Sequence, residues 1–166
     1  MKQNSNIKIA VLGLGNELLR DDGVGIHAVR SPQLSRLKGI TIAQIGTAAL
    51  HAQQILIESD YVIAIDAIHH DGSPGTIYSF DADDEKCNCV YSLHDLGIIG
   101  ALNLLPKHLR PKVRIIGVEP QIIDYGLQLS DNVKASLPKL IELVMQTVEK
   151  IINEKLTNSP VTIVRN

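Results

Sequence analysis

Four short apolar runs, separated by segments with a helical pattern, are the feature of this sequence that most limits its fold. The runs are Ile7–Gly13, Ile40–Ile45, Tyr61–Asp66 and Val113–Val118. Each is rich in β-branched residues and lacks the apolar–polar alternation of a strand with one solvent-exposed face. Strands of this kind lie in parallel sheets that helices cover on both faces. The runs therefore predict an α/β protein, a three-layer α/β/α sandwich with a mostly parallel central sheet.

Helical patterns occupy the gaps between the runs, over Gly23–Arg30, Thr47–Glu58 and His94–Leu105. The last of these is expected to stop at Pro106, because a proline ring cannot continue a helix interior. A fifth strand, Gly75–Phe80, follows a turn sequence and is expected to join the sheet as an antiparallel edge.

The clearest helical pattern lies towards the C-terminus, where apolar side chains recur on one face. These residues are Leu140, Ile141, Val144, Met145, Val148, Ile151 and Ile152. Ser130 is expected to cap this helix, and Pro138 to cause a break or kink, because a proline inside a helix costs about 3 kcal/mol. The chain of 166 residues is long enough for one core. We therefore expect a single α/β domain over residues 1–166, with a flexible tail at residues 157–166.

Composition argues against several functional classes. Lys and Arg number 16 against 18 Asp and Glu, which gives a net charge of −2, and only 3% of the residues are aromatic. No nucleic-acid partner is expected, because such a face needs basic residues for phosphates and aromatic rings for bases. The sequence shows no signal peptide or membrane span, so a cytoplasmic protein without a membrane partner is expected. Cys87 and Cys89 suit neither a disulfide framework nor a paired zinc site and are expected to be inert.

A glycine-rich turn follows the first run and ends in two adjacent carboxylates, Asp21 and Asp22. It matches a dinucleotide-binding fingerprint only in part, because Leu18 stands where the third glycine is needed. The two carboxylates would also repel a pyrophosphate. One of them is expected to cap the following helix, which leaves the other available for a ligand.

Asp66 is the more unusual carboxylate, because it stands at the carboxyl end of a run that should be a central strand. Ligands of open α/β sheets bind at this edge, and Asp22 falls there too if the first and third runs are neighbours. His94 stands where a loop enters an apolar helix. Two carboxylates and a neutral imidazole offer donors that suit nickel, zinc or iron. The alternatives are structural: a turn or hydrogen bond for Asp66, and a helix-start or partly buried histidine for His94.

Other residues are weaker candidates for the same site. His69 and His70 stand next to an acidic turn and are expected on an exposed face. Glu17 lies on the glycine-rich turn and is a minor candidate that solvation would also explain. A nucleophilic serine is not indicated, because the chain has no G-x-S-x-G sequence.

Seven segments form an ordered series along the chain. They are Gly13–Gly25, Gly46–Ala48, Asp66–Ala67, Pro74–Thr76, Ser92–Gly97, Ile116–Pro120 and Gly126–Ser130. In this order the series resembles the hydrogenase maturation endopeptidases, and the resemblance covers nearly the whole chain, from Ile7 to Lys155.

The resemblance implies a phosphorylase/hydrolase-like fold and an enzyme that removes a C-terminal extension from the precursor of a nickel-iron hydrogenase large subunit. Removal follows nickel insertion, so the nickel is expected to arrive with the precursor, although another divalent ion can occupy such a site in vitro. In this family two acidic residues and a histidine contact the metal. Here these positions are Asp22, Asp66 and His94, which are also the expected catalytic residues. The expected partner is the precursor, and the enzyme itself is expected to be a monomer.

Three alternatives stay open at this level. One is a non-enzymatic nickel-binding assembly factor with the same ligands, and another is a metal-independent acid protease on the same fold. The third, a nucleotide or peptidyl-tRNA enzyme, is disfavoured by the net charge of −2. The apolar helical segment after His94 is expected to lie partly in the core and to offer an exposed strip to the precursor.

Overall fold

The structure is a computed structural model that describes residues 7–83, 91–92 and 97–157. Its elements are, in chain order, β1 (Ile9–Leu14), η1 (Arg20–Gly23), α1 (Val24–Val29), α2 (Pro32–Ser35), β2 (Ile40–Gly46), η2 (Ala49–Ala52), α3 (Gln53–Glu58), β3 (Tyr61–His69), β4 (Ile77–Asp81), β5 (Tyr91–Ser92), α4 (Ile98–Asn103), η4 (Lys107–Leu109), β6 (Lys112–Val118) and α5 (Asp131–Thr157). Each of the five predicted strands is present, with ends displaced by a few residues from the predicted ones.

The sheet has the strand order β2-β1-β3-β6-β4. The first four strands are parallel, and β4 pairs antiparallel with β6 at the edge, so the predicted antiparallel edge strand is confirmed. β3 continues three residues beyond Asp66, and its last residues pair antiparallel with β5. β1 and β3 lie side by side in the sheet, which the sequence argument for the candidate site requires.

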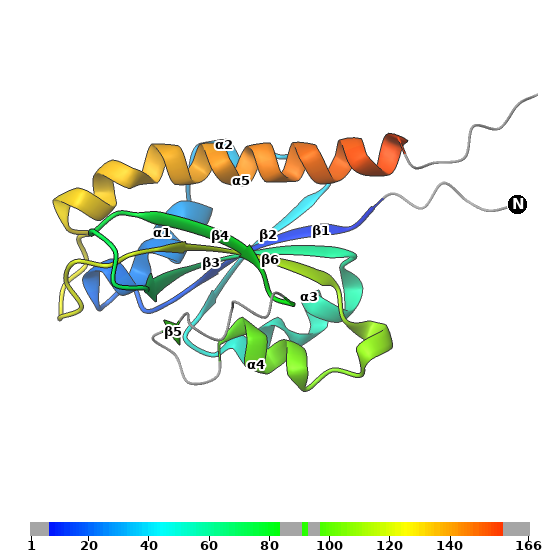
Figure 1. The fold of residues 1–166 in the computed structure, drawn as a ribbon, viewed down its shortest axis with the longest axis horizontal. Coiled ribbons are helices and arrows are strands. Elements are labelled where there is room, and N and C mark those ends of the chain that lie inside the picture. The colour runs from blue at the N-terminus through cyan, green and yellow to red at the C-terminus, as the bar shows by residue number, and fades with distance from the viewer. Residues whose placement is uncertain (1–6, 84–90, 93–96, 158–166) are drawn as a thin grey trace, which may run out of the picture.

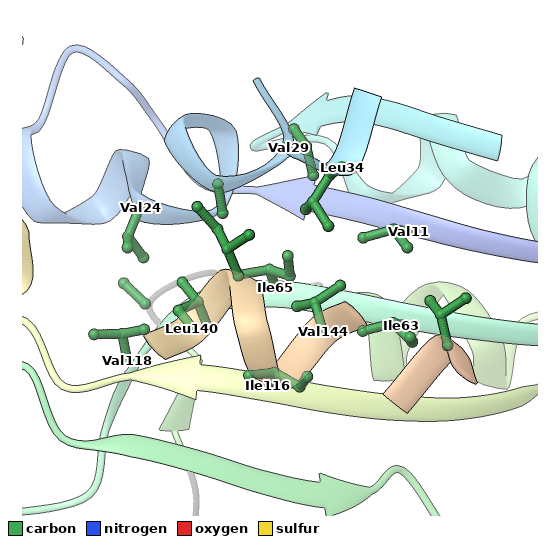
Figure 2. Packing of buried hydrophobic residues seen from close by; sticks show 14 of the residues in the cluster. Val11, Val24, Val29, Leu34, Ile63, Ile65, Ile116, Val118, Leu140 and Val144 are labelled. Atoms are coloured by element: carbon green, nitrogen blue, oxygen red, sulfur yellow. The ribbon is translucent and has the colours of Figure 1, made fainter. Parts of the chain in front are cut away.

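Helices cover both faces of the sheet, as Figure 1 shows, and the predicted three-layer sandwich is confirmed. On one face α1, α2 and α5 pack against the strands (Figure 1). The side chains in this core include Val11, Ile63, Ile65 and Ile116 from strands and Val24, Leu34, Leu140 and Val144 from helices (Figure 2). On the other face η2, α3 and α4 contribute Ala52, Leu56, Ala101 and Leu102. Each large aliphatic side chain that is fully buried stabilises the fold by about 1.5–3 kcal/mol.

The C-terminal helix continues through Pro138. α5 runs from Asp131 to Thr157 with Pro138 inside it, so the helix is not broken, but Figure 1 shows its first turns inclined to the rest, in agreement with the predicted kink. The apolar stripe packs on the sheet on both sides of the proline, with Val133 and Leu140 buried. This packing offsets the hydrogen bond that the proline nitrogen cannot donate. Ser130 directly precedes the helix, at the predicted cap position, and its carbonyl accepts from the Lys134 N–H, but its hydroxyl donates to Asp21.

Two other predicted helices are shorter or divided. The segment predicted at Thr47–Glu58 consists of η2 followed by α3. Within the segment predicted at His94–Leu105, α4 begins at Ile98, and residues 93–96 lie outside the described residues. Residues 158–166, most of the predicted tail, also lie outside them. None of the described helices is both long enough and apolar enough to span a membrane.

Candidate functional site at the carboxyl edge of the sheet

Three loops meet where β1, β3 and β6 end. We name them the β1 loop (residues 15–23), the β3 loop (residues 70–76) and the β6 loop (residues 119–130), and Figure 1 shows them at one end of the sheet. Because β1 and β3 are parallel neighbours, Asp66 in β3 lies at the edge from which the β1 loop leaves. The structure therefore brings the surroundings of Asp22 and Asp66 together at one edge, as expected for ligand sites of open α/β sheets.

Glycines allow the β1 loop to fold back tightly on the strand ends. Gly15 has a φ of +108°, and a Cβ atom there would stand 1.7 Å from the carbonyl oxygen of Asp22. At Gly25 a Cβ atom would stand 2.3 Å from the carbonyl oxygen of Ile65. A side chain at either position is therefore incompatible with this packing. The glycines of the turn serve the close approach of η1 and α1 to the sheet rather than the binding of a dinucleotide.

Asp22 and Asp66 are both buried carboxylates. The Asp22 side chain is 1% exposed, and its Oδ2 accepts a hydrogen bond from the Asn16 N–H at 2.9 Å. The Asp66 side chain is 5% exposed, stands opposite Gly117 of β6 and accepts from the Ala67 N–H at 2.9 Å. Burial disfavours an ionised carboxylate unless donors or a cation compensate. Two buried carboxylates at a ligand-binding edge are therefore candidate site residues.

Asp21 has a structural role that the sequence argument did not find. Its side chain is fully buried and accepts from the Gln121 N–H at 2.8 Å, the Ile122 N–H at 2.8 Å, and the Ser130 N–H and Oγ at 2.7 Å each. The expectation that one aspartate of the pair caps α1 is wrong. Gly23 occupies that N-cap position without a side-chain hydrogen bond, because η1 lies between the turn and α1. Asp21 instead holds the β6 loop against the β1 loop.

Glu119 is a further buried carboxylate, and the sequence argument did not propose it as a site residue. It is 4% exposed and accepts from the His70 N–H at 2.8 Å, the Gly72 N–H at 3.2 Å and the Tyr78 hydroxyl at 2.8 Å. Burial by itself would raise the pKa of Glu119, but these donors outweigh it and lower the pKa. Burial, followed by the hydrogen bond to Glu119, raises the pKa of Tyr78 to about 12. Glu119 directly follows β6, and this strand-end position is the signal that could have found it.

The weaker candidates have identifiable partners. His69 and His70 are exposed, as predicted, and Nδ1 of His69 lies 3.2 Å from Oε1 of Glu119. Glu17 forms an ion pair with Arg30, whose Nη2 also donates to Gln44 Oε1 at 2.8 Å. The hydrogen bond from Arg30 lowers the pKa of the Glu17 carboxyl. Glu17 therefore ties the β1 loop to α1 and β2.

His94, Cys87 and Cys89 lie outside the described residues. In the described residues before His94, Ser92 of β5 pairs with Ile68 near the end of β3. Across residues 7–83, 91–92 and 97–157, no three His, Cys, Asp or Glu side chains form a group that could hold a metal ion. This search does not test the metal site predicted from sequence, because that site includes His94, which lies outside the described residues.

Comparison with known proteins identifies the family. Residues 31–147 match the HycI family, hydrogenase maturation protease. This match covers more than half of the chain. The chain belongs to the hydrogenase maturation protease family. The resemblance inferred from the ordered motifs is thus confirmed, and the chain is an endopeptidase of this family.

Individual relatives agree with this assignment. The hydrogenase expression/formation protein HupD of Bradyrhizobium diazoefficiens is 33% identical over 154 residues, which cover 85% of this chain and 78% of that protein. The structure of the [NiFe] hydrogenase maturation protease HybD from Thermococcus kodakarensis matches at 33% identity with a TM-score of 0.74, covering 85% of this chain and 99% of that one. The hydrogenase maturating endopeptidase HybD from E. coli matches at 26% identity with a TM-score of 0.76, covering 87% and 93%.

Proposed function

We propose that this endopeptidase removes the C-terminal extension of a nickel-iron hydrogenase large-subunit precursor after nickel has been inserted. In this proposal Asp22, Asp66 and His94 contact the nickel that the precursor carries. The observation that supports it most is the pair of buried carboxylates at the carboxyl edge of the sheet in a chain of this family. The relative from Thermococcus kodakarensis, which is 33% identical, is a [NiFe] hydrogenase maturation protease.

The proposed donor set suits nickel held by another protein. Carboxylate oxygens and an imidazole nitrogen are donors that Ni²⁺ accepts. Three protein donors leave coordination positions open for ligands of the precursor, whereas a closed four-donor site would not. In this view nickel is part of the substrate. The enzyme distinguishes nickel-loaded from nickel-free precursor because only the loaded form offers a metal ion to Asp22, Asp66 and His94.

Rigid surroundings support a positioning role for this edge. Asp66 belongs to a central strand that is hydrogen-bonded on both sides, by β1 and β6. Asp22 follows Asp21, whose four accepted hydrogen bonds hold η1 in place. Groups that are held before the substrate arrives contribute to catalysis by fixing the orientation of the reacting bond. We infer that binding of the nickel-loaded precursor places its scissile peptide bond at this edge.

The test is a processing assay with purified protein. Nickel-loaded and nickel-free precursors are incubated with the enzyme, and the mass of the large subunit is measured. We expect the shortened subunit only from the nickel-loaded precursor. Equal cleavage of the nickel-free precursor in the presence of a chelator would instead support a metal-independent acid protease. Absence of any shortened subunit with intact precursor binding would support an assembly factor.

Single substitutions test two of the three proposed contacts, Asp66 and His94. Asp66→Asn and His94→Ala are expected to lower processing by several orders of magnitude, because the first replaces a charged carboxylate donor by a weaker neutral amide and the second removes the imidazole donor. Circular dichroism checks that both variants remain folded. The matched control is His108→Ala, since His108 is exposed in η4, which leads into the start of β6, at the opposite end of that strand from the site. Full processing by either the Asp66 or the His94 variant would contradict the assigned role.

A further inference from the structure

A patch of exposed apolar side chains adjoins the two carboxylates. We name it the edge patch, and it consists of Leu18 on the β1 loop and Ile123, Tyr125 and Leu127 on the β6 loop. The exposed fractions are 56% for Leu18, 85% for Tyr125 and 63% for Leu127. Single exposed apolar residues are common on protein surfaces, but several large ones on adjoining loops indicate an interaction surface.

Backbone hydrogen bonds hold the two loops of the edge patch side by side. The Gly126 N–H donates to the Leu18 carbonyl, and the Arg20 N–H donates to the Gly126 carbonyl. In both hydrogen bonds the nitrogen and oxygen atoms are 2.9 Å apart. Leu18 therefore lies beside the segment that carries Tyr125 and Leu127. Asp21 holds both ends of the same loop through its hydrogen bonds. Because the patch is ordered before binding, little conformational entropy is lost when a partner contacts it.

A pocket of about 390 Å³ continues the edge patch beyond Leu18. It lies between the β1 loop and the end of β2, and its lining includes Asn16, Leu18, Gln44 and Thr47. Its lining combines apolar side chains, among them Leu18 and Ile45, with polar ones, and this combination suits a polypeptide, which has both apolar side chains and backbone hydrogen-bonding groups.

The position of the edge patch indicates its occupant. Leu18 belongs to the same loop as Asp22, and the β6 loop is bonded to Asp21, the residue directly before Asp22. A polypeptide that reaches Asp22 and Asp66 for cleavage must therefore lie across or beside the edge patch. In a protease, the polypeptide in that place is the substrate.

The helix that the sequence predicts as a docking strip is a poorer surface. In α4, Ile98 is 5% exposed, Ala101 is fully buried and Leu102 is 4% exposed, because all three pack in the core on that face of the sheet. Leu104, which is 62% exposed, follows this helix. It has the same residue type and nearly the same exposure as Leu127, so it serves as a control for the edge patch.

We propose that the edge patch is the surface on which the folded large-subunit precursor docks, through an apolar surface of its own next to the cleavage site. This inference rests on the proposed function, because it takes the precursor as the substrate. The contact contributes to binding and not to peptide hydrolysis. Its loss therefore raises KM and leaves kcat nearly unchanged.

The test compares single and combined serine variants in the processing assay with nickel-loaded precursor. Tyr125→Ser and Leu127→Ser are each expected to raise KM on the order of tenfold, since truncating a central aromatic or apolar anchor of an interface commonly has that effect. The double variant is expected to raise it further, with kcat within about twofold of the wild type. Leu104→Ser is expected to leave both constants unchanged. Binding of nickel-free precursor to the same variants is measured in parallel and should weaken in the same order.

Each result decides between stated explanations. Unchanged KM and unchanged binding for the Tyr125 and Leu127 variants would overturn the docking surface while leaving the proposed function intact. A change from dimer to monomer in sedimentation, with unchanged KM, would overturn it too and would assign the edge patch to contact between two copies of the chain. If the wild-type enzyme does not shorten the precursor, the proposed function itself fails, and this outcome differs from the first two.

Discussion

Among the described residues, four carboxylates lie buried at or beside the carboxyl edge of the sheet, and their places in the fold indicate different roles. Asp21 and Glu119 each accept several hydrogen bonds from backbone N–H groups of the loops that they hold. Asp22 and Asp66 each accept from a nearby backbone N–H and stand where the loops meet β3. We interpret the first pair as structural and the second pair as the proposed contacts to the nickel of the precursor.

Asp21→Asn is expected to lower the free energy of unfolding by about 2–3 kcal/mol. The change removes the negative charge and replaces one accepting oxygen by an amide group that faces N–H donors, and a hydrogen bond to a charged group contributes about 1.5–3 kcal/mol. Urea unfolding measures the difference. Asp131→Asn, at the exposed start of α5, is the control and should cost at most about 1 kcal/mol. A loss no larger than that of the control would show that the four hydrogen bonds to Asp21 contribute little to stability.

Tyr78 makes stability depend on alkaline pH. Its pKa in the folded protein is raised from 10.0 to about 12, by burial and by the hydrogen bond to Glu119. A group with a raised pKa contributes stability that is fully present below its unfolded pKa and is lost as the pH rises through the folded value. The free energy of unfolding of the wild type should therefore decline between about pH 10 and about pH 12. Tyr78→Phe should lack this part of the decline, and identical pH profiles would contradict the assignment.

At the scale of elements, tertiary packing decides how far the local rules for helix interruption and helix capping apply. A proline in a helix interior predicts a break or a kink, and α5 is bent near Pro138 but continues through it because Val133 and Leu140 are both anchored in the core. The prediction that Asp21 or Asp22 caps α1 is wrong. A carboxylate before a helix predicts a cap, but both residues lie within the short η1, and Gly23 takes the N-cap position of α1.

Pro138→Ala is expected to raise the free energy of unfolding by about 1–3 kcal/mol. Pro138 is exposed, so alanine loses little packing and restores a backbone N–H at this position of the helix. The larger entropy of the unfolded alanine chain subtracts up to about 1 kcal/mol from the gain. Thermal and urea unfolding measure the change, with Lys139→Ala at the neighbouring exposed position as the control. Destabilisation by the proline replacement would show that the inclined first turns of α5 need the proline.

At the scale of the whole molecule, the residues that stabilise the fold and the residues of the candidate site lie in different parts of the sheet. Its two faces are covered by helices and form the cores, whereas its carboxyl edge carries the loops, the two candidate carboxylates and the edge patch. Substitutions in the cores should therefore change stability, and substitutions in the edge patch should change KM. This division follows from the topology, because the parallel strands all end at one edge, where loops connect them to the following elements.

The sequence by itself determined the elements, the layered fold and the family. Strand and helix periodicities are local, so β-branched runs and apolar stripes can be recognised without the structure. The strand-end position of Asp66 was equally visible. Only the tertiary structure decided which carboxylate holds a loop and which stands at the meeting of the loops. Asp21 reaches Ser130 across 109 residues, and Glu119 reaches His70 across 49, and no local pattern records such contacts. For the same reason the edge patch, formed by loops that are distant in sequence, could not be read from either loop alone.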